Sequence, residues 1–296
     1  MKKIFTLVIA ISFAISSFAQ MKGVDHVVLI GTDGFGAFIL NKHKGSFPNL
    51  EKLMAEGSST LEMRSVLPSS SAVNWASMLM GAGPELHGYT EWGSKTPELP
   101  SREIGKYGIF PGVFGQMRQK YPQAETGVIY SWEGIGYLYE KEAVNYNKFE
   151  KDDDIKVLQS ATQYLMEKKP VLSFIYFSQP DGAGHSIGWD SPEYFEECKK
   201  IDAYVGDIMK SLHVAGMDKN TIVIFSSDHG GVEKGHGGKS MQEMQVPYIV
   251  WGTPVKKNHK IEESTMIYDN AATMAHILGF DCPQVWISRP VLSIFK

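Results

Sequence analysis

The chain has 296 residues, of which 43% are hydrophobic, and a formal net charge of -4 at pH 7. This is enough apolar material for one sizeable α/β domain. Because there is no basic excess, the composition carries no electrostatic footprint for nucleic-acid binding. A small anionic substrate would need a local source of positive charge, such as a metal ion.

Residues 1–20 have the order of a secretory signal peptide: Lys2 and Lys3, an apolar run from Ile4 to Ala14, and small residues before Gln20. The apolar run is too short to span a bilayer, and no later stretch approaches ~20 continuous apolar residues. We therefore expect cleavage near Ala19 and Gln20, export to the periplasm or the medium, and no membrane span in the mature chain.

The two cysteines, Cys198 and Cys282, are too few for a disulfide framework. Cys198 lies in a helical pattern, where a buried inert thiol is expected. Neither cysteine has the spacing of a metal ligand or of a catalytic thiol.

The first strand is expected at Val24–Ile30, a β-branched run typical of a strand buried on both faces. The turn G-T-D-G-F-G follows and places Asp33 at the carboxyl end of that strand. Ligands of open α/β sheets bind at this edge, although an Asp-Gly pair is also an ordinary turn. A short capped helix at Ser46–Gly57 and a strand at Ser59–Leu67 come next.

The segment Arg64–Gly88 brings a short apolar run, a proline and three serines to the start of an amphipathic stretch. A hydroxyl is thereby delivered to a helix start, where unpaired backbone N–H groups can hold an anion. The alternative is that these serines only cap the helix.

The loop Tyr89–Gly108 is irregular, and its Trp92 either contacts a substrate or packs beneath the loop. The acidic run Asp152–Asp154 is interpreted as a solvated helix start rather than a metal site. The regular elements expected in this part of the chain are a helix at Gly112–Tyr121, a strand at Gly127–Tyr130 and a helix at Asp152–Lys168.

A further buried strand is expected at Val171–Phe177, followed by S-Q-P-D-G-A-G-H. Asp181 and His185 are four residues apart in this glycine-rich turn, so both side chains can face one ion without a helix. The helix Ser191–His213 follows, with Asp202 and Asp207 expected to face solvent or to support the site from behind.

The strand Thr221–Phe225 leads into S-S-D-H-G-G, and G-H-G-G follows. Asp228 and His229 cannot both face the core without a cost in free energy, because a buried charge needs a partner. A second metal would supply that partner. His236, between glycines, is either a flexible loop residue or a further ligand. A strand at Val246–Trp251 and a helix at Asp269–Gly279 complete the pattern. His276, near the end of this helix, is explained by the helix dipole.

Strands alternate with helices throughout, which predicts an α/β fold: a three-layer sandwich with a central, mostly parallel sheet flanked by helices. The acidic and imidazole clusters each follow a buried strand. Three Asp and three His side chains with a hydroxyl suit zinc better than calcium, because imidazole favours the softer ion.

The chain resembles the alkaline phosphatase superfamily, most closely its type I phosphodiesterase and nucleotide pyrophosphatase branch. The matching motifs, in family order, are I-G-T-D-G-F, P-S-S-S-A-V-N with G-A-G-P-E-L-H-G, Q-P-D-G-A-G-H-S-I-G, S-S-D-H-G, G-H-G-G, and D-N-A-A-T-M-A-H-I-L-G with R-P-V-L. They cover nearly the whole mature chain. The resemblance implies that residues 21–296 form a single alkaline phosphatase-like catalytic domain.

The resemblance also implies two Zn²⁺ ions and assigns the site residues. Asp33, Asp228 and His229 would hold one zinc together with the nucleophile, and Asp181, His185 and His236 would hold the other. Ser71 occupies the position of the nucleophile, a threonine in this branch and a serine elsewhere in the superfamily. Asn74 matches the motif asparagine, and Ser69 and Ser70 would cap the helix or support the ligands from outside the site.

Two departures from the family pattern affect the expected substrate. Trp92 stands where the diesterases carry an asparagine that binds a nonbridging oxygen, so phosphate recognition differs or is borne by Asn74 and backbone N–H groups. The gap between S-D-H-G and G-H-G is also shorter than in the nucleotide pyrophosphatases, which is typical of compact members.

These observations predict an exported, zinc-dependent hydrolase of a small phosphate ester that acts through a phosphoseryl intermediate. A diesterase is favoured, and the alternatives are a phosphomonoesterase of the same superfamily and a binding protein that retains zinc without turnover. A sulfatase would need C/S-x-P-x-R, and Ser69–Val73 has neither the proline nor the arginine in place. Phosphoryl transferases carry an inserted domain or membrane helices, which the sequence lacks.

Overall fold

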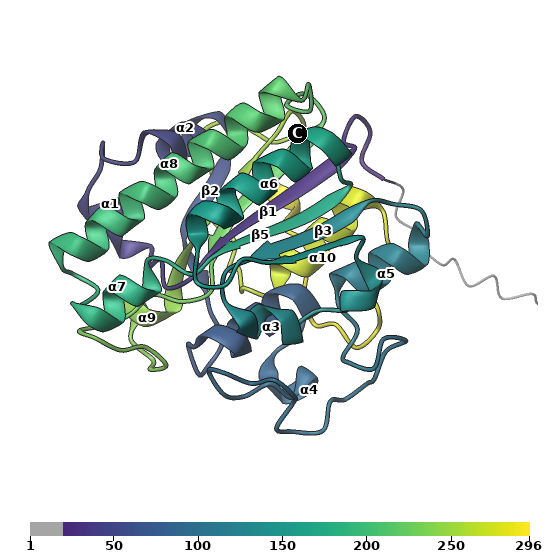
Figure 1. The fold of residues 1–296 in the computed structure, drawn as a ribbon, viewed down its shortest axis with the longest axis horizontal. Coiled ribbons are helices and arrows are strands. Elements are labelled where there is room, and N and C mark those ends of the chain that lie inside the picture. The colour runs from purple at the N-terminus through teal and green to yellow at the C-terminus, as the bar shows by residue number, and fades with distance from the viewer. Residues whose placement is uncertain (1–19) are drawn as a thin grey trace, which may run out of the picture.

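Eight strands form one central sheet in the order β4-β3-β5-β1-β6-β7-β2-β8 (Figure 1). The computed structural model describes residues 20–296, so the predicted signal peptide lies outside the described residues apart from Gln20. The strands are β1 His26–Thr32, β2 Ser58–Arg64, β3 Thr126–Tyr130, β4 Tyr146–Phe149, β5 Leu172–Phe177, β6 Thr221–Ser227, β7 Gln245–Trp251 and β8 His259–Lys260.

The strand directions bring several carboxyl ends to one edge of the sheet. Strands β1, β3, β4, β5 and β6 are parallel, and β7 is antiparallel to both β6 and β2. It follows that β2 runs in the same direction as β1. The segments after β1, β2, β5 and β6 therefore meet at a common edge, which is where open α/β sheets bind ligands.

The helices cover both faces of the sheet, which confirms the predicted three-layer sandwich (Figure 1). They are α1 Phe38–Lys42, α2 Pro48–Glu56, α3 Ser71–Met80, α4 Pro84–His87, α5 Val113–Lys120, α6 Asp154–Lys168, α7 Asp181–Ser186, α8 Pro192–Val214, α9 Met241–Met244 and α10 Asp269–Leu278, with short 3-10 turns η1 Glu133–Tyr137, η2 Lys141–Ala143 and η3 Leu292–Ile294.

Strand β1 shows why the sheet needs helices on both sides. Val27 and Leu29 belong to an apolar core shared with α3, α5 and α10, whereas Val28 and Ile30 belong to a second core shared with α2, α6 and α8. Successive side chains of a strand point to opposite faces, so a run without alternation must be covered twice. The continuous apolar runs of the sequence are explained by this double burial.

The structure departs from the sequence prediction at several short elements, and helices α1, α4 and α9 are among those that were not predicted. Strands β4 and β8 were not predicted, because they lie at the sheet edges and lack an apolar run. Asp181 and His185 lie on the short helix α7 rather than in a turn without a helix. Gly184 permits this helix to pack closely, since a Cβ there would lie 2.6 Å from the Trp189 ring.

The acidic residues of α8 have separate roles. Asp202 is buried and accepts the backbone N–H groups of Asn49 and Leu50, so it binds the first turn of α2. The sequence analysis expected Asp202 to face solvent or to support the site from behind. The structure shows instead that it contacts α2. Asp207 is exposed, as expected. Cys198, also on α8, is buried as predicted, and Cys282 is an exposed free thiol.

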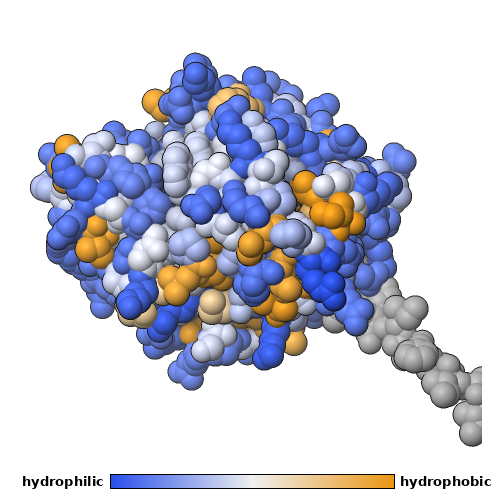
Figure 2. Space-filling model, turned by 90° about the horizontal axis from the view of Figure 1, so that it is seen from below, coloured by the Kyte–Doolittle hydropathy of each residue, from blue (hydrophilic) through white to orange (hydrophobic). Residues whose placement is uncertain are grey.

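The molecular surface alternates between polar and apolar residues. Figure 2 views the molecule from the side on which α4 lies, and the apolar side chains there form a broken band that polar residues interrupt. Within residues 20–296, every helix is too short or too polar to cross a membrane.

Candidate active site

The six predicted metal ligands come together in two clusters at the shared edge of the sheet. Asp33 follows β1, and Asp228 and His229 follow β6, and these three residues form a buried cluster. Asp181, His185 and His236 form a second, more accessible one. In each cluster the candidate ligand atoms all lie within 4.8 Å of one another. This grouping is the one that the family resemblance implied.

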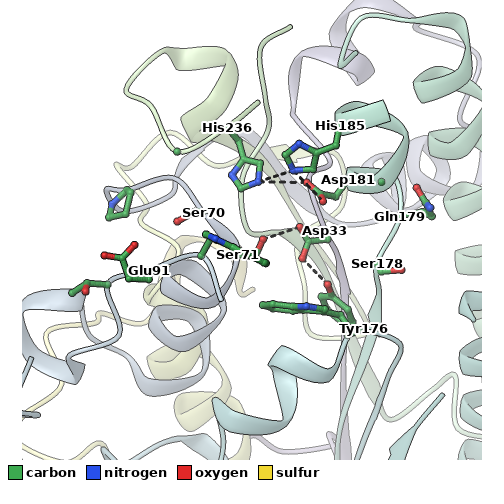
Figure 3. Close-up of a pocket in the computed structure, with 16 residues that line it drawn as sticks. Asp33, Ser70, Ser71, Glu91, Tyr176, Ser178, Gln179, Asp181, His185 and His236 are labelled. Carbon is green, nitrogen blue, oxygen red and sulfur yellow. Dashed lines mark hydrogen bonds and ion pairs between the residues drawn. The ribbon is translucent and has the colours of Figure 1, made fainter. Parts of the chain in front are cut away.

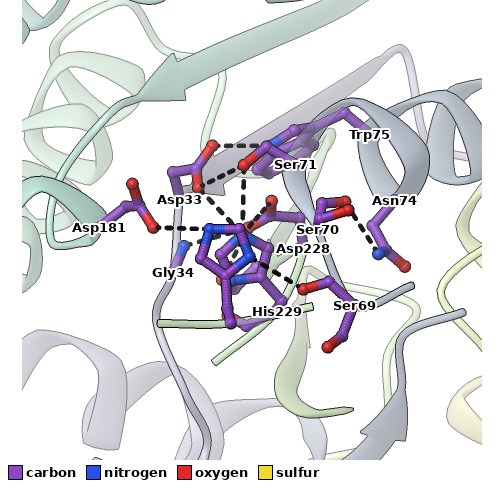
Figure 4. A network of polar contacts seen from close by, with 12 residues as sticks. Asp33, Gly34, Ser69, Ser70, Ser71, Asn74, Trp75, Asp181, Asp228 and His229 are labelled. Atoms are coloured by element: carbon purple, nitrogen blue, oxygen red, sulfur yellow. Dashed lines mark hydrogen bonds and ion pairs between the residues drawn. The ribbon is translucent and has the colours of Figure 1, made fainter. Parts of the chain in front are cut away.

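Ser71 lies at the start of α3 and faces the buried cluster (Figure 4). Its Oγ is 3.3 Å from Asp33 Oδ1 and 3.2 Å from His229 Nε2. The residue is the first of α3, and it lines the pocket that opens over both clusters. The hydroxyl is therefore in contact with two candidate ligands of one metal.

The three imidazoles share one hydrogen-bond pattern. His185 Nδ1 lies 2.9 Å from the Lys234 carbonyl, His229 Nδ1 2.7 Å from the Gly230 carbonyl, and His236 Nδ1 3.1 Å from the Ser69 carbonyl. A carbonyl only accepts hydrogen bonds, so each neutral ring carries its proton on Nδ1 and a lone pair on Nε2. This is how proteins orient histidine ligands.

The consequence is sharpest where two rings meet. The Nε2 atoms of His185 and His236 are 3.1 Å apart (Figure 3). With both Nδ1 atoms protonated, two lone pairs face each other, which is unfavourable without a cation between or beside them. The donor set of this cluster thus fits a metal ion better than it fits a hydrogen-bonded network.

The carboxylates of the two clusters also fit bound metal ions. Asp181 Oδ1 and Asp228 Oδ2 are buried without a hydrogen-bond partner. Burial, and next the charge of Asp33, raise the pKa of Asp181 to about 9 and that of Asp228 well above its usual value. Burial also lowers the pKa of His229 and of His236 to about 3. Carboxylate oxygens that lack hydrogen bonds and lie beside neutral imidazoles fit divalent cations, which favour the ionised carboxylates.

Two aromatic residues that the sequence reading missed hold Asp33 in place. The Tyr176 hydroxyl donates to Asp33 Oδ2 at 2.6 Å, and Trp75 Nε1 donates to the same oxygen at 3.0 Å. Oδ1 is left for Ser71 and His229. Tyr176 lies within a buried apolar strand and Trp75 within a buried helix, so neither carried a signal that distinguished it from ordinary core residues.

The predicted capping role of Ser69 and Ser70 is wrong. Ser70 occupies the N-cap of α3, yet its side chain makes no capping hydrogen bond. Ser69 Oγ donates instead to the Gly238 carbonyl at 2.6 Å. Together with the bond between His236 and the Ser69 carbonyl, this ties the His236 loop to the serine segment.

Asn74 does not line the pocket, and the predicted contact with substrate finds no support in the geometry. The residue is fully buried, its Oδ1 accepts the Val66 N–H at 2.7 Å, and its Nδ2 donates to the Pro68 and Ser70 carbonyls. The amide therefore organises the segment before Ser71. An amide at this position satisfies the backbone of a buried loop, which a sequence motif cannot distinguish from substrate binding.

Trp92 lines the pocket. Its side chain is 66% exposed, and its carbonyl accepts the Ala72 N–H at 3.0 Å. That bond occupies one of the free N–H groups at the start of α3 and holds the loop against Ser71. The pocket has a volume of about 650 Å³ and is also lined by Glu91 and Trp132.

Asp154 was predicted to be part of a solvated helix start, and the structure corrects this. It is half-buried, and its carboxylate accepts the Ser131 hydroxyl and the backbone N–H groups of Ser178 and Gln179. Its neighbour Asp153 has the expected role and caps α6 by accepting the Lys156 N–H. Three consecutive aspartates offered no sequence signal that separated these two roles.

Comparison with known proteins finds relatives that are named as pyrophosphatases and phosphodiesterases. It is 28% identical over 214 residues to mouse ectonucleotide pyrophosphatase/phosphodiesterase family member 1, covering 69% of this chain and 24% of that protein. It is 25% identical over 225 residues to human bis(5'-adenosyl)-triphosphatase ENPP4, covering 69% of this chain and 47% of that protein. The chain thus spans about a quarter to a half of the length of these relatives.

The fold agrees with solved structures at low sequence identity. Murine ectonucleotide pyrophosphatase/phosphodiesterase 5 superposes with a TM-score of 0.75 at 15% identity, over 92% of this chain and 100% of that one. BT1596, a 2-O glycosaminoglycan sulfatase, superposes with a TM-score of 0.73 at 14% identity, over 91% of this chain and 73% of that one. Residues 27–235 match the family model for type I phosphodiesterase/nucleotide pyrophosphatase. The chain belongs to the type I phosphodiesterase/nucleotide pyrophosphatase family.

Proposed function

We propose that the chain is a hydrolase of phosphate esters that holds two zinc ions and uses Ser71 as its nucleophile. The observation that carries this proposal is the position of Ser71 Oγ, 3.3 Å from Asp33 and 3.2 Å from His229 beside the second ligand cluster. Asp33, Asp228 and His229 would hold one ion, and Asp181, His185 and His236 the other. Three imidazoles with three carboxylates favour zinc.

The chemistry divides into two displacements at phosphorus. When bound, the two cations supply positive charge to the attacking and leaving oxygens and lower the pKa of a coordinated hydroxyl or water. Ser71 Oγ loses its proton to solvent and bonds to phosphorus while the bond to the leaving oxygen breaks, giving a phosphoseryl enzyme. Water then attacks the same phosphorus, and Ser71 Oγ regains a proton as it leaves.

A diester is the preferred substrate class. The pocket of about 650 Å³ extends beyond the ligand clusters to Glu91, Trp92 and Trp132, which leaves space for a second substituent on phosphorus. The names of the relatives, pyrophosphatase/phosphodiesterase and bis(5'-adenosyl)-triphosphatase, agree with this choice. A phosphomonoesterase and a zinc-binding protein without turnover are the two alternatives.

Purified protein assayed with nitrophenyl phosphate monoesters and diesters tests the proposal. We expect zinc-dependent turnover, faster on diesters, that Ser71→Ala abolishes. Absence of turnover on every ester, or a fully active Ser71→Ala variant, would contradict it. Native mass spectrometry separates the remaining alternative, because two zinc ions without turnover indicate a binding protein.

We also propose that residues 21–296 act as a single exported domain. One sheet collects strands from His26 to Lys260, and the sequence order of residues 1–20 supports a signal peptide. Fractionation of cells that express the full chain tests export: the uncleaved chain in the cytoplasm would contradict it.

A further inference from the structure

The indole of Trp189 packs against both imidazoles of the accessible cluster, which consists of Asp181, His185 and His236. Trp189 lies in the connection between α7 and α8 (Figure 1), and it is fully buried. Its ring centroid is 5.0 Å from that of His185 and 5.8 Å from that of His236, and the planes meet at 84° and 70°. Because protein interiors are close-packed, this ring restricts the rotamers that the two imidazoles can adopt.

The indole N–H acts on the buried cluster through the turn after Asp33. Trp189 Nε1 donates to the Gly34 carbonyl at 2.9 Å, and the Gly34 N–H donates to Asp228 Oδ1 at 3.1 Å. Gly34 therefore joins two carboxylates of this cluster, since it follows Asp33 in the chain and is hydrogen-bonded to Asp228. The Tyr194 hydroxyl donates to the same carbonyl at 2.8 Å, so two side chains hold the turn.

The main chain of Trp189 holds the loop that leads to His236. Its N–H donates to the Glu233 carbonyl at 2.8 Å, and Glu233 has a φ of 53°, in the left-handed region. The next carbonyl, that of Lys234, lies 2.9 Å from His185 Nδ1. A glutamate adopts a left-handed backbone only where surrounding contacts hold it. The hydrogen bond from Trp189 is one of these contacts.

Two glycines of the ligand motifs make room for the indole. A Cβ on Gly184 would lie 2.6 Å from the Trp189 ring, and a Cβ on Gly231 would lie 2.2 Å from it. Gly184 directly precedes His185, and Gly231 follows His229 by two residues. The nearest indole atoms belong to the fused rings rather than to a flexible end, so neither contact could be relieved cheaply. Both motifs are therefore matched to an indole at position 189.

We propose that Trp189 is a positioning residue that holds both candidate metal clusters in the arrangement that binds two ions. This inference rests on the proposed function, because it specifies how the ligands of the two zinc ions are placed. The indole N–H acts on the buried cluster through Gly34, and the indole ring acts on the accessible cluster through His185 and His236. Ligands that are held in place before binding lose less conformational entropy when the ion binds.

The test removes the two parts of the indole separately. Benzothienylalanine incorporated at position 189 keeps the shape of the rings but has sulfur in place of the N–H. Zinc affinity should then fall about tenfold at the buried cluster and stay unchanged at the accessible one. Trp189→Phe removes the N–H together with one of the two rings, so affinity should fall about tenfold at each cluster.

Zinc affinity is measured for each cluster by competition with a chelator in two backgrounds. His185→Ala leaves the three ligands of the buried cluster in place, and Asp228→Asn leaves those of the accessible cluster in place. Native mass spectrometry counts the bound ions in each protein. These measurements report on metal binding and do not depend on turnover.

Two further variants separate positioning from a general effect on folding. Trp286→Phe removes another buried indole, whose N–H donates to the Pro111 carbonyl at 2.7 Å. It should lower the stability to urea and keep wild-type zinc affinity at both clusters. Tyr194→Phe removes the second donor to the Gly34 carbonyl and keeps its ring beside Trp189. It should weaken the buried cluster alone.

Each outcome decides the inference. Unchanged affinity of the buried cluster in the benzothienylalanine protein would overturn it and leave the proposed function standing, and this protein also decides the question if Trp189→Phe does not fold. Equal losses of zinc affinity in Trp189→Phe and Trp286→Phe would overturn it as well, because they would show that the indole only stabilises the fold. A wild-type protein that binds no zinc would overturn the proposed function itself.

Discussion

Asp154 Oδ2 accepts the backbone N–H of Gln179 at 3.0 Å, two residues before the candidate metal ligand Asp181. Asp154 Oδ1 accepts the N–H of Ser178 at 2.9 Å. The first turn of α6 thereby holds the segment that carries Asp181 from the end of β5 into α7. Asp154, which does not line the pocket, therefore fixes the backbone that leads to a candidate metal ligand.

Replacing Asp154 should weaken metal binding more than its effect on folding alone suggests. Asp154→Ala leaves the half-buried Gln179 N–H without its acceptor and the Ser178 N–H with only Ser131 Oγ, which costs about 1–3 kcal/mol of unfolding free energy. Zinc affinity should also fall ~10–100-fold, as for other groups that orient ligands. Urea unfolding and competition with a chelator measure the two effects.

Asp153→Ala is the matched control for that experiment. It removes the α6 cap, which costs about 1 kcal/mol, without touching the segment before Asp181. Zinc affinity should be unchanged. Equal affinities in the two variants would show that Asp154 only stabilises the fold.

Metal removal should destabilise the protein, because the two clusters leave Asp181 Oδ1 and Asp228 Oδ2 without hydrogen-bond partners. Free zinc at about 1,000 times its Kd would stabilise the native state by about 4 kcal/mol per site. Calorimetry with and without a chelator measures the shift in Tm. His185→Ala should lose one zinc, whereas His213→Ala, at an exposed histidine paired with Asp218, should keep both. A Tm that zinc does not change would count against both sites.

Tyr176→Phe should weaken the buried metal cluster with little change in the fold. The ring still fills its place in the core, but Asp33 Oδ2 loses the hydroxyl that donates at 2.6 Å. We expect zinc affinity to fall ~10–100-fold. Tyr121→Phe, which removes a hydroxyl that donates to the Leu278 carbonyl at 3.0 Å, is the control and should bind zinc normally. A Tyr176→Phe variant with wild-type affinity would refute the supporting role.

Glu140 should make stability depend on pH. Burial raises the pKa of this carboxyl from 4.5 to about 7, and its Oε2 has no hydrogen-bond partner. Because the folded-state pKa is the higher one, the folded state binds the proton more tightly. Ionisation of Glu140 therefore destabilises the folded state. This loss of stability is absent below pH 4.5 and grows until the pH passes about 7. The shift corresponds to about 3 kcal/mol.

Glu140→Gln isolates this effect, since the amide cannot ionise. Urea unfolding from pH 4.5 to 8 should show the wild type losing stability relative to Glu140→Gln as the pH rises. The carboxylates of the metal clusters titrate in both proteins and cancel in the difference. Parallel stability curves would show that the pKa of Glu140 is the same in the folded and unfolded states, which contradicts the prediction.

Much of the fold and of the site was predictable, because short sequence patterns indicate the strands and the candidate ligands that follow them. Strands buried on both faces produce continuous apolar runs, and the candidate ligands follow those runs directly, as Asp33 follows β1 and Asp228 follows β6. The short edge strands were not predictable, since β4 alternates between half-buried and exposed residues without an apolar run. The roles of Asp153 and Asp154 could not be separated, because adjacent positions of one acidic run face different surroundings.

By itself, the sequence determined the sandwich architecture, the family and the residues that form the two candidate metal clusters. These depend on strand periodicity and on motifs whose members lie within a few residues of one another. Only the tertiary structure decided that Tyr176 and Trp75 hold Asp33, that Asn74 serves the backbone before Ser71, and that Glu91 shares a pocket with Trp132. Those relationships join residues far apart in the chain or depend on side-chain direction, which packing around the sheet edge sets.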